Sequence, residues 1–367
     1  MFLGRYPHML SIDKWMPVAL SVGIFAFAVS LLDVYSKKVI TFQAVLLFTS
    51  QIIGIMHGEF FFIAIAIFIL GANNKNYKII IRINVIVAVL WNIAAFIASQ
   101  TGYIDYLVYG ITRHAFGSVF MLEFALHIVF ICIGFCLLKI IKENTSFKVL
   151  IIAMILLLFF IHHYVIARSD EVILLILLIG TCFVELCHWW NFRFARSGKV
   201  LFACLIPIYA FLQIFMLSVS MLWTSSLVQE TISFINQYTD AHSLMERIQF
   251  GWVAAVNYGI KPFGSMIYEQ GYGGATNNVE NYFFLDSAYH RLPIIYGWIF
   301  TVSFIGLLVW IMYRLWKNEQ YFVMFLFTLA AISGLTEFRM LDVSYNVLPI
   351  LAFSTNDLLK KRDGSVT

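Results

Sequence analysis

Long blocks of apolar residues alternate with short polar segments along this chain, and this pattern predicts a series of membrane-spanning helices. A bilayer core takes about 20 consecutive apolar residues per helix. The candidate blocks lie at residues 16–32, 39–56, 58–72, 79–98, 116–138, 147–167, 171–190, 200–222, 292–313, 321–336 and 343–359. The two-residue alternation of a membrane β-barrel is absent. The predicted fold is therefore an all-α integral membrane protein, a single polytopic domain over residues 1–367 with about 11 transmembrane helices.

The second and third blocks are separated only by His57-Gly58-Glu59. One continuous helix over residues 39–72 would be too long for a single span. We therefore interpret these blocks as a tight hairpin whose turn lies outside the membrane. Because the third block is short, a re-entrant segment is the alternative interpretation.

The composition indicates that lipid rather than water is the solvent of this chain. Apolar residues make up 61% of the 367 residues and charged residues only 12%, with a mean hydropathy of +0.86. Soluble domains carry roughly 25% charged residues. A soluble cytosolic enzyme, a secreted disulfide scaffold and a disordered chain are therefore excluded.

The distribution of basic residues predicts the orientation. With the amino terminus outside and the carboxyl terminus inside, the inner segments hold sixteen of the 24 lysines and arginines, in line with the positive-inside rule. The connection at 223–291 then lies outside, between the eighth and ninth spans, and its length favours a functional role. Within it, residues 243–259 have apolar side chains at helical spacing, and the glycine-rich stretch 271–274 indicates a turn.

The sequence contains no motif for nucleotide, redox or metal chemistry. A Walker loop, a dinucleotide fingerprint, an HExxH pair and a Gly-x-Ser-x-Gly elbow are all absent. All five cysteines lie inside apolar blocks, as expected for small buried side chains. Cys132 and Cys136 share a helix face but have no further ligand nearby in the sequence, which argues against zinc. We expect no cofactor, no metal and no nucleic-acid partner.

Arginines on the outer face are the first candidates for binding residues, because the positive-inside rule disfavours them there. They are Arg113, Arg168, Arg247, Arg291 and Arg339. A guanidinium group binds phosphate through a bidentate fork, so several converging arginines would suit a pyrophosphate. The alternative is that each is an interfacial side chain paired with a neighbouring acid. Acids that offer such pairs are Asp170, Glu246, Glu337 and Asp342.

Other polar residues of the outer face are less specific. The aromatic side chains of the long loop suit stacking on sugar rings, with an ordinary interfacial aromatic belt as the alternative. Histidines near this face, His290 among them, could act as general bases. Within the fifth span, Glu123 and His127 lie one turn apart and are expected to form a buried pair that faces the bundle. A structural and a functional role of that pair are both open.

Five short motifs, in this order, resemble the Wzy family of bacterial O-antigen, capsule and exopolysaccharide polymerases, which is distantly related to the O-antigen ligases. They are Arg113-His114-Ala115-Phe116-Gly117, Arg168-Ser169, Arg247 followed by Gly259 and Lys261-Pro262-Phe263-Gly264, Asp286-Ser287-Ala288-Tyr289 followed by Gly297, and Leu335-Thr336-Glu337. The chain departs from the family pattern at residues 118–121, where asparagine-proline-asparagine is usual, and at Ser287, where asparagine is usual. Asp286 stands where the ligase branch has histidine, which favours a polymerase.

The resemblance implies a metal-independent glycosyltransferase of the multi-span type C class in the bacterial cytoplasmic membrane, with an extracytoplasmic active site. Polyprenyl-pyrophosphate-linked oligosaccharide repeat units would be donor and acceptor. Membrane lipid, a flippase and a chain-length regulator would be the partners.

The same resemblance assigns roles to the candidate residues. Those expected to bind substrate are Arg113, Arg168, Arg247, Tyr289, Arg291 and Arg339, the first three of them holding the pyrophosphate. Those expected in catalysis are Asp286, His290 and Glu337, in this order of preference as the base that accepts the hydroxyl proton.

Three other function classes remain as alternatives. An O-antigen ligase is the alternative within the enzymes. A polysaccharide flippase or another transporter is the main alternative outside them, although the scarcity of charge within the spans argues against it. A sensor or assembly subunit would not need arginines in several separate outer loops.

Overall fold

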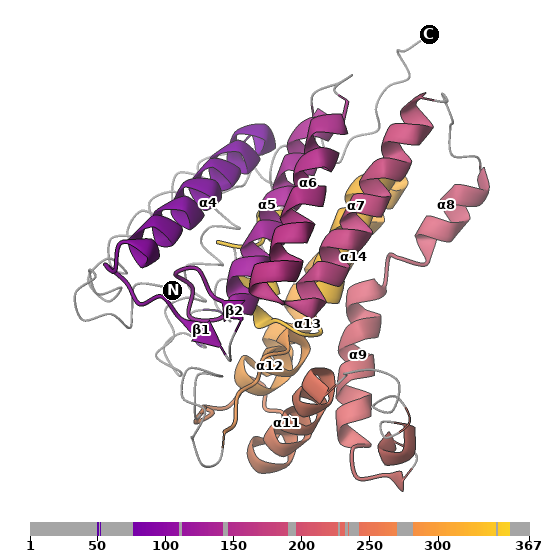
Figure 1. Ribbon diagram of the computed structural model, residues 1–367. Helices are drawn as coiled ribbons and strands as arrows, with labels where there is room; N and C mark the ends of the chain where they lie inside the picture. The colour runs from indigo at the N-terminus through magenta and orange to yellow at the C-terminus, as the bar shows by residue number, and fades with distance from the viewer. Residues whose placement is uncertain are drawn as a thin grey trace.

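The computed structural model describes residues 76–352 with gaps at 110–111, 142–145, 190–195, 227, 232–233, 235–241, 270–281 and 343, together with residues 50 and 52. Over these residues the chain is mostly helical (Figure 1). The spans predicted at 16–32, 39–56 and 58–72, and with them the predicted hairpin, lie outside the described residues apart from positions 50 and 52.

The described helices and strands follow the order of the predicted blocks. The α-helices are α4 (Tyr77–Gln100), α5 (Met121–Ile141), α6 (Lys148–Phe160), α7 (Arg168–Trp189), α8 (Arg196–Ala203), α9 (Ile208–Met221), α11 (His242–Tyr258), α12 (Ala288–Ile295), α13 (Gly297–Lys317) and α14 (Tyr321–Ser333). A π-helical turn, η2 (Ile161–Val165), extends α6, and two 3-10 helices, η3 (Phe338–Leu341) and η4 (Leu348–Ala352), follow α14. The strands β1 (Val108–Tyr109) and β2 (Arg113–His114) pair antiparallel.

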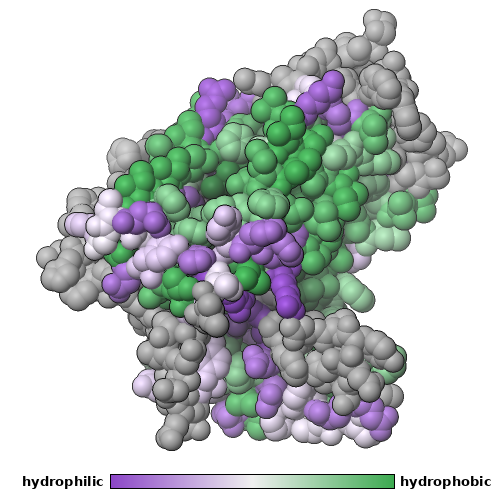
Figure 2. All heavy atoms as spheres, in the orientation of Figure 1, coloured by the Kyte–Doolittle hydropathy of each residue, from purple (hydrophilic) through white to green (hydrophobic). Residues whose placement is uncertain are grey.

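Apolar helices of membrane-spanning length are compatible with the predicted all-α membrane protein. Among the described residues, the segments long and apolar enough to cross a membrane are Tyr77–Gln100, Met121–Ile140, Lys148–Val165 and Gly297–Lys317. Figure 2 shows an apolar band over the face that carries α4, α6 and α7, with polar residues above and below it. Large apolar side chains of α4, among them Leu90, are exposed. The total of eleven spans stays a prediction.

Two predicted spans differ in detail from the observed helices. The block at 200–222 forms two helices, α8 and α9, because Pro207 lacks an N–H donor and begins a new helix instead of continuing the first. The block at 292–313 is likewise divided. Gly297 has a φ of +84°, a left-handed conformation that ends α12 and starts α13.

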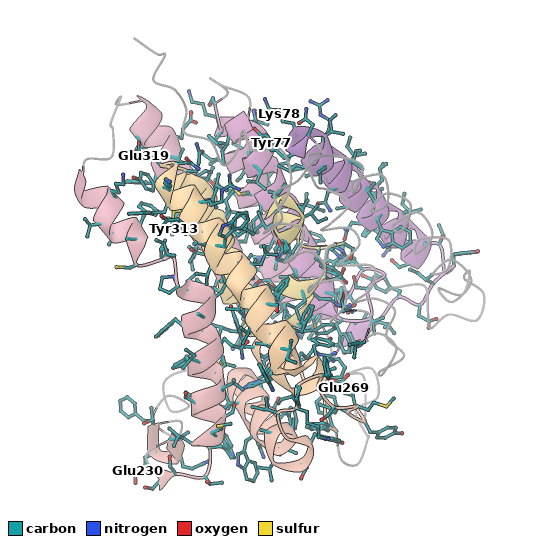
Figure 3. All side chains as sticks on the ribbon, turned by 180° about the vertical axis from the view of Figure 1, so that it is seen from behind. Tyr77, Lys78, Glu230, Glu269, Tyr313 and Glu319 are labelled. Atoms are coloured by element: carbon teal, nitrogen blue, oxygen red, sulfur yellow. The ribbon has the colours of Figure 1, made fainter. Side chains whose placement is uncertain are left out.

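The core of the bundle lies between α5, α7, α9, α13 and α14, which pack against one another, whereas α4 contacts chiefly α5. Tyr209 illustrates the packing, because its buried hydroxyl donates a hydrogen bond of 2.7 Å to the carbonyl oxygen of Phe327 in α14. The two ends of the bundle differ in what they carry. Figure 3 shows Lys78 and Glu319 at one end and Glu269 at the other, where α11 and α12 also lie.

The described part of the long loop packs against the helices. The helix predicted at 243–259 is confirmed as α11, whereas the turn predicted at 271–274 lies outside the described residues. Residues 261–265 dock on the start of α13: the N–H groups of Trp298 and Ile299 donate to the carbonyl oxygens of Lys261 and Pro262, at 3.1 and 3.3 Å. Two donors that a helix start leaves without intrahelical partners are thereby satisfied.

Candidate functional site

The candidate site is built around Arg247, a buried arginine on α11. Its Nη2 atom lies 3.7 Å from Oδ2 of Asp286 and 3.7 Å from Oε1 of Glu337. Its Nε donates a hydrogen bond of 2.8 Å to the carbonyl oxygen of Thr336. The structure thus brings together three of the residues expected in the site, which come from separate parts of the sequence. One guanidinium group stands between two carboxylates.

The two acids are held near each other by contacts between their neighbours. Asp286 precedes α12 and Glu337 precedes η3, and these elements pack together. The Ser287 hydroxyl donates to the carbonyl oxygen of Gly334 at 3.1 Å, and the Ala288 N–H donates to the same oxygen at 3.0 Å. Asp286 keeps 29% of its side chain exposed, whereas the side chain of Glu337 keeps only 5%. Asp286 is therefore the acid of this pair that a substrate could reach.

A third carboxylate, Asp170, lies in the polar first turn of α7. Its side chain is fully buried, and neither carboxylate oxygen has a hydrogen-bond partner. Burial raises the pKa of Asp170 well above its ordinary value. Arg247 is near enough to oppose this shift with its positive charge. The sequence offered a signal for including Asp170 in the site, because this acid lies in the same short turn as the candidate Arg168.

The turn before α7 also collects two of the expected binding arginines. Arg113 on β2 donates from Nη2 to the carbonyl oxygen of Ile166 at 3.0 Å. Arg168 is exposed and close enough to lower the pKa of Arg113, although burial has the larger effect on that pKa. The adjacent guanidinium groups carry like charge, so binding of an anion between them would relieve their repulsion. This turn therefore presents Arg168 to solvent and Asp170 to the interior.

Burial and neighbouring charges shift the pKa values of the two acids beside Arg247. Burial raises the pKa of Asp286 to about 6, although Arg247 and Arg291 oppose the shift. Burial, with the nearby carboxylate of Asp286, raises the pKa of Glu337 well above its ordinary range. At neutral pH Asp286 is then ionised, while burial favours the neutral form of Glu337. An ionised, partly exposed carboxylate with this pKa suits general-base chemistry.

Arg291 is a buried arginine beside Asp286, but its contacts are with protein groups. Its Nη2 lies 2.5 and 2.7 Å from the two carboxylate oxygens of Glu269, and its Nε donates to the carbonyl oxygen of Leu285 at 2.6 Å. Its guanidinium carbon lies 4.1 Å from the ring centre of Phe338 and 4.9 Å from that of Phe284. Glu269 was not among the residues expected in the site, because its partner is distant in the sequence.

Arg339 forms a neighbouring buried charge cluster. It pairs with Glu123 of α5, and its Nη1 lies 3.6 Å from Oδ2 of Asp342. Glu123 and His127 are both buried, as predicted; the carboxylate of Glu123 contacts the distant Arg339, and the His127 ring stacks on Tyr345 with ring centres 3.5 Å apart. Arg339 fits the alternative interpretation, in which an arginine pairs with a neighbouring acid, because Asp342 is such an acid.

Tyr289 and His290 are buried in α12 rather than presented to a substrate. The Tyr289 hydroxyl donates to the carbonyl oxygen of Ala331 at 2.8 Å. Nε2 of His290 lies 2.7 Å from the hydroxyl oxygen of Ser220 on α9, and its ring packs against Gly251. Burial lowers the pKa of His290 to about 4, so it is neutral at physiological pH. Among the three residues expected as the base, the geometry favours Asp286.

Nothing in the described part of the chain is arranged as a metal site, since three or more His, Cys, Asp or Glu side chains do not converge there. Comparison of the whole chain with protein-family models, curated proteins and solved structures finds no match.

Proposed function

We propose that this protein is a membrane glycosyltransferase that polymerises polyprenyl-pyrophosphate-linked oligosaccharide repeat units into a surface polysaccharide. The observation that carries the proposal is the cluster at one end of an apolar bundle, in which partly exposed Asp286 lies beside the buried guanidinium of Arg247. A base with a pKa of about 6, at the edge of a membrane protein, suits the transfer of a lipid-carried sugar to a hydroxyl group.

In the proposed reaction, Asp286 accepts the proton of the acceptor hydroxyl. The hydroxyl oxygen forms a bond to the anomeric carbon of the donor, while the bond from that carbon to the pyrophosphate oxygen breaks. The pyrophosphate leaves with the bonding electron pair. The positive charge of Arg247 favours the ionised form of Asp286, and burial favours the neutral form of Glu337 beside it.

The arginines of the turn before α7 are proposed to bind the departing pyrophosphate. Arg113 and Arg168 lie close together and offer two guanidinium groups, of which that of Arg168 is exposed. Preorganised positive charge stabilises a leaving group as its negative charge develops. Arg247, which pairs with two acids, is better suited to tuning the base than to holding the pyrophosphate.

The proposal also specifies a location and partners. The site would face the extracytoplasmic side of the bacterial cytoplasmic membrane. The polyprenyl carrier of the substrate would lie among the membrane lipids there. A flippase would supply the repeat unit, and a chain-length regulator would limit the polymer.

The test is conversion of a purified lipid-linked repeat unit by the protein reconstituted in liposomes. A ladder of polymer lengths is the expected product, and Asp286→Asn should abolish it. Glu319→Gln, which changes an acid at the opposite end of the bundle, is the matched control and should retain the ladder. Transfer to a different acceptor without a ladder would indicate a ligase, movement of the intact unit across the bilayer would indicate a flippase, and either result would overturn the proposal.

A further inference from the structure

The pair formed by Glu269 and Arg291 has a geometry that ties it to the backbone next to Asp286. Oε1 of Glu269 accepts a hydrogen bond of 3.0 Å from the Leu285 N–H, and Nε of Arg291 donates one of 2.6 Å to the Leu285 carbonyl oxygen. Both backbone groups of the residue that precedes Asp286 are therefore held by one ion pair. The direction in which Asp286 leaves the backbone depends on that pair.

The same ion pair also reaches the segment that carries Glu337. The guanidinium group of Arg291 lies over the rings of both Phe284 and Phe338, and Phe338 directly follows Glu337. The two rings contact each other edge-on, with centres 6.0 Å apart. Arginine stacks well on aromatic faces because its guanidinium is planar and delocalised, which a lysine ammonium is not. Arg291 thus contacts both acid-bearing segments with different parts of one side chain.

We propose that Glu269 and Arg291 form a positioning pair that holds the segments of Asp286 and Glu337 on either side of Arg247. Arg291 would then act through its neighbours, in place of the direct contact with substrate expected from the sequence. Glu269 becomes a functional residue of the site. This inference rests on the proposed function only for its catalytic consequence, since the contacts themselves do not depend on the substrate.

The charges of the pair act on Asp286 in opposite directions. Arg291 lowers the pKa of Asp286 and Glu269 raises it. Loss of either charge alone should therefore shift the pKa of Asp286. When both charges are lost, the two opposite shifts should largely cancel. This sign pattern separates an electrostatic and positioning role from general damage to the fold, which would shift the titration without regard to the sign of the charge removed.

The test uses four variants: Arg291→Lys, Arg291→Gln, Glu269→Gln and the double variant Arg291→Gln with Glu269→Gln. Arg314→Lys is the matched control, because Arg314 also lies over an aromatic ring, that of Trp310, 4.9 Å from its guanidinium carbon. Each folded protein is isolated in detergent. Carbodiimide, which reacts with protonated carboxyl groups, is then applied over a range of pH, and modification of Asp286 is followed by mass spectrometry. Polymer formation is measured in parallel at varied concentrations of the lipid-linked repeat unit.

The labelling midpoint of Asp286 should rise in Arg291→Gln, fall in Glu269→Gln and return toward the wild-type value in the double variant. Arg291→Lys keeps the charge but loses the fork and the stacking, so kcat should fall about 10- to 100-fold with KM little changed. Arg314→Lys should behave as wild type. Unchanged labelling midpoints, or a wild-type kcat in Arg291→Lys, would overturn the positioning role. Opposite midpoint shifts in a protein whose wild type makes no polymer would support the pair and refute the proposed function.

Discussion

Replacement of Arg247 by methionine should show which carboxylate carries the negative charge of the site. Methionine keeps much of the length of the side chain but removes the only cation that the structure places within 4.0 Å of both Asp286 and Glu337, among the described residues. Because Asp286 is ionised at neutral pH and burial favours the neutral form of Glu337, the lost attraction should be mainly to Asp286.

The magnitude follows from the ion-pair distance of 3.7 Å. Two unit charges at that distance attract by roughly 4–5 kcal/mol when the effective dielectric constant is about 20. Partial exposure of Asp286 reduces this value, and removal of one partner of a buried pair typically costs about 3–5 kcal/mol. We expect Arg247→Met to lower the free energy of unfolding by about 3 kcal/mol.

The assay is a pair of double-mutant cycles, measured by reversible denaturation in detergent at neutral pH. Addition of Asp286→Asn to Arg247→Met should restore more than half of the lost stability, because no unpaired charge remains. Addition of Glu337→Gln should restore much less. Equal recovery from the two substitutions, or none from Asp286→Asn, would refute the assignment of the charge to Asp286.

Two further predictions concern the base and the backbone that supports the site. Polymer formation should rise with pH and level off above about 6, because the pKa of Asp286 lies there and only its ionised form accepts a proton; a rate that is constant across this range would contradict the role of the base. Gly264→Ala should reduce the yield of folded protein sharply, since Gly264 has a φ of +80° and an added methyl group would overlap the carbonyl oxygen of Ile295. Gly259→Ala is its control: with a φ of +70° and no neighbour within 4 Å, it should cost only about 1–2 kcal/mol, and equal losses of unfolding free energy would refute the steric argument.

Membrane helices could be predicted from this sequence because apolar composition and length are local properties. The helices α4, α5 and α14 fall within a few residues of their predicted blocks. The breaks at Pro207 and Gly297 were harder to predict, since both lie inside apolar runs where hydropathy does not change. Their effect comes from a missing N–H donor and from a left-handed backbone conformation.

The members of the candidate site could be proposed from sequence, but their partners could not. Arg339 and Glu123 are separated by 216 positions, and Arg247 and Thr336 by 89, so only the packing of the helices brings them together. Glu269 could not be predicted as a site residue, because acids are common in outer loops. Only its contact with Arg291 distinguishes it from the others. His290 was a candidate base because histidine titrates near neutral pH. Its burial and its contact with Ser220 show that it packs in the core instead.

The docking of residues 261–265 on the first turn of α13 links the site to a helix that is long and apolar enough to cross a membrane. A membrane helix adapts to a change in hydrocarbon thickness by tilting, and the first turn of α13 would then carry the attached loop segment with it. Glu269 follows that segment by four positions and holds Leu285, so a tilt would be transmitted to the orientation of Asp286. We therefore expect acyl chains of different length to alter the rate of polymer formation without any change in the protein.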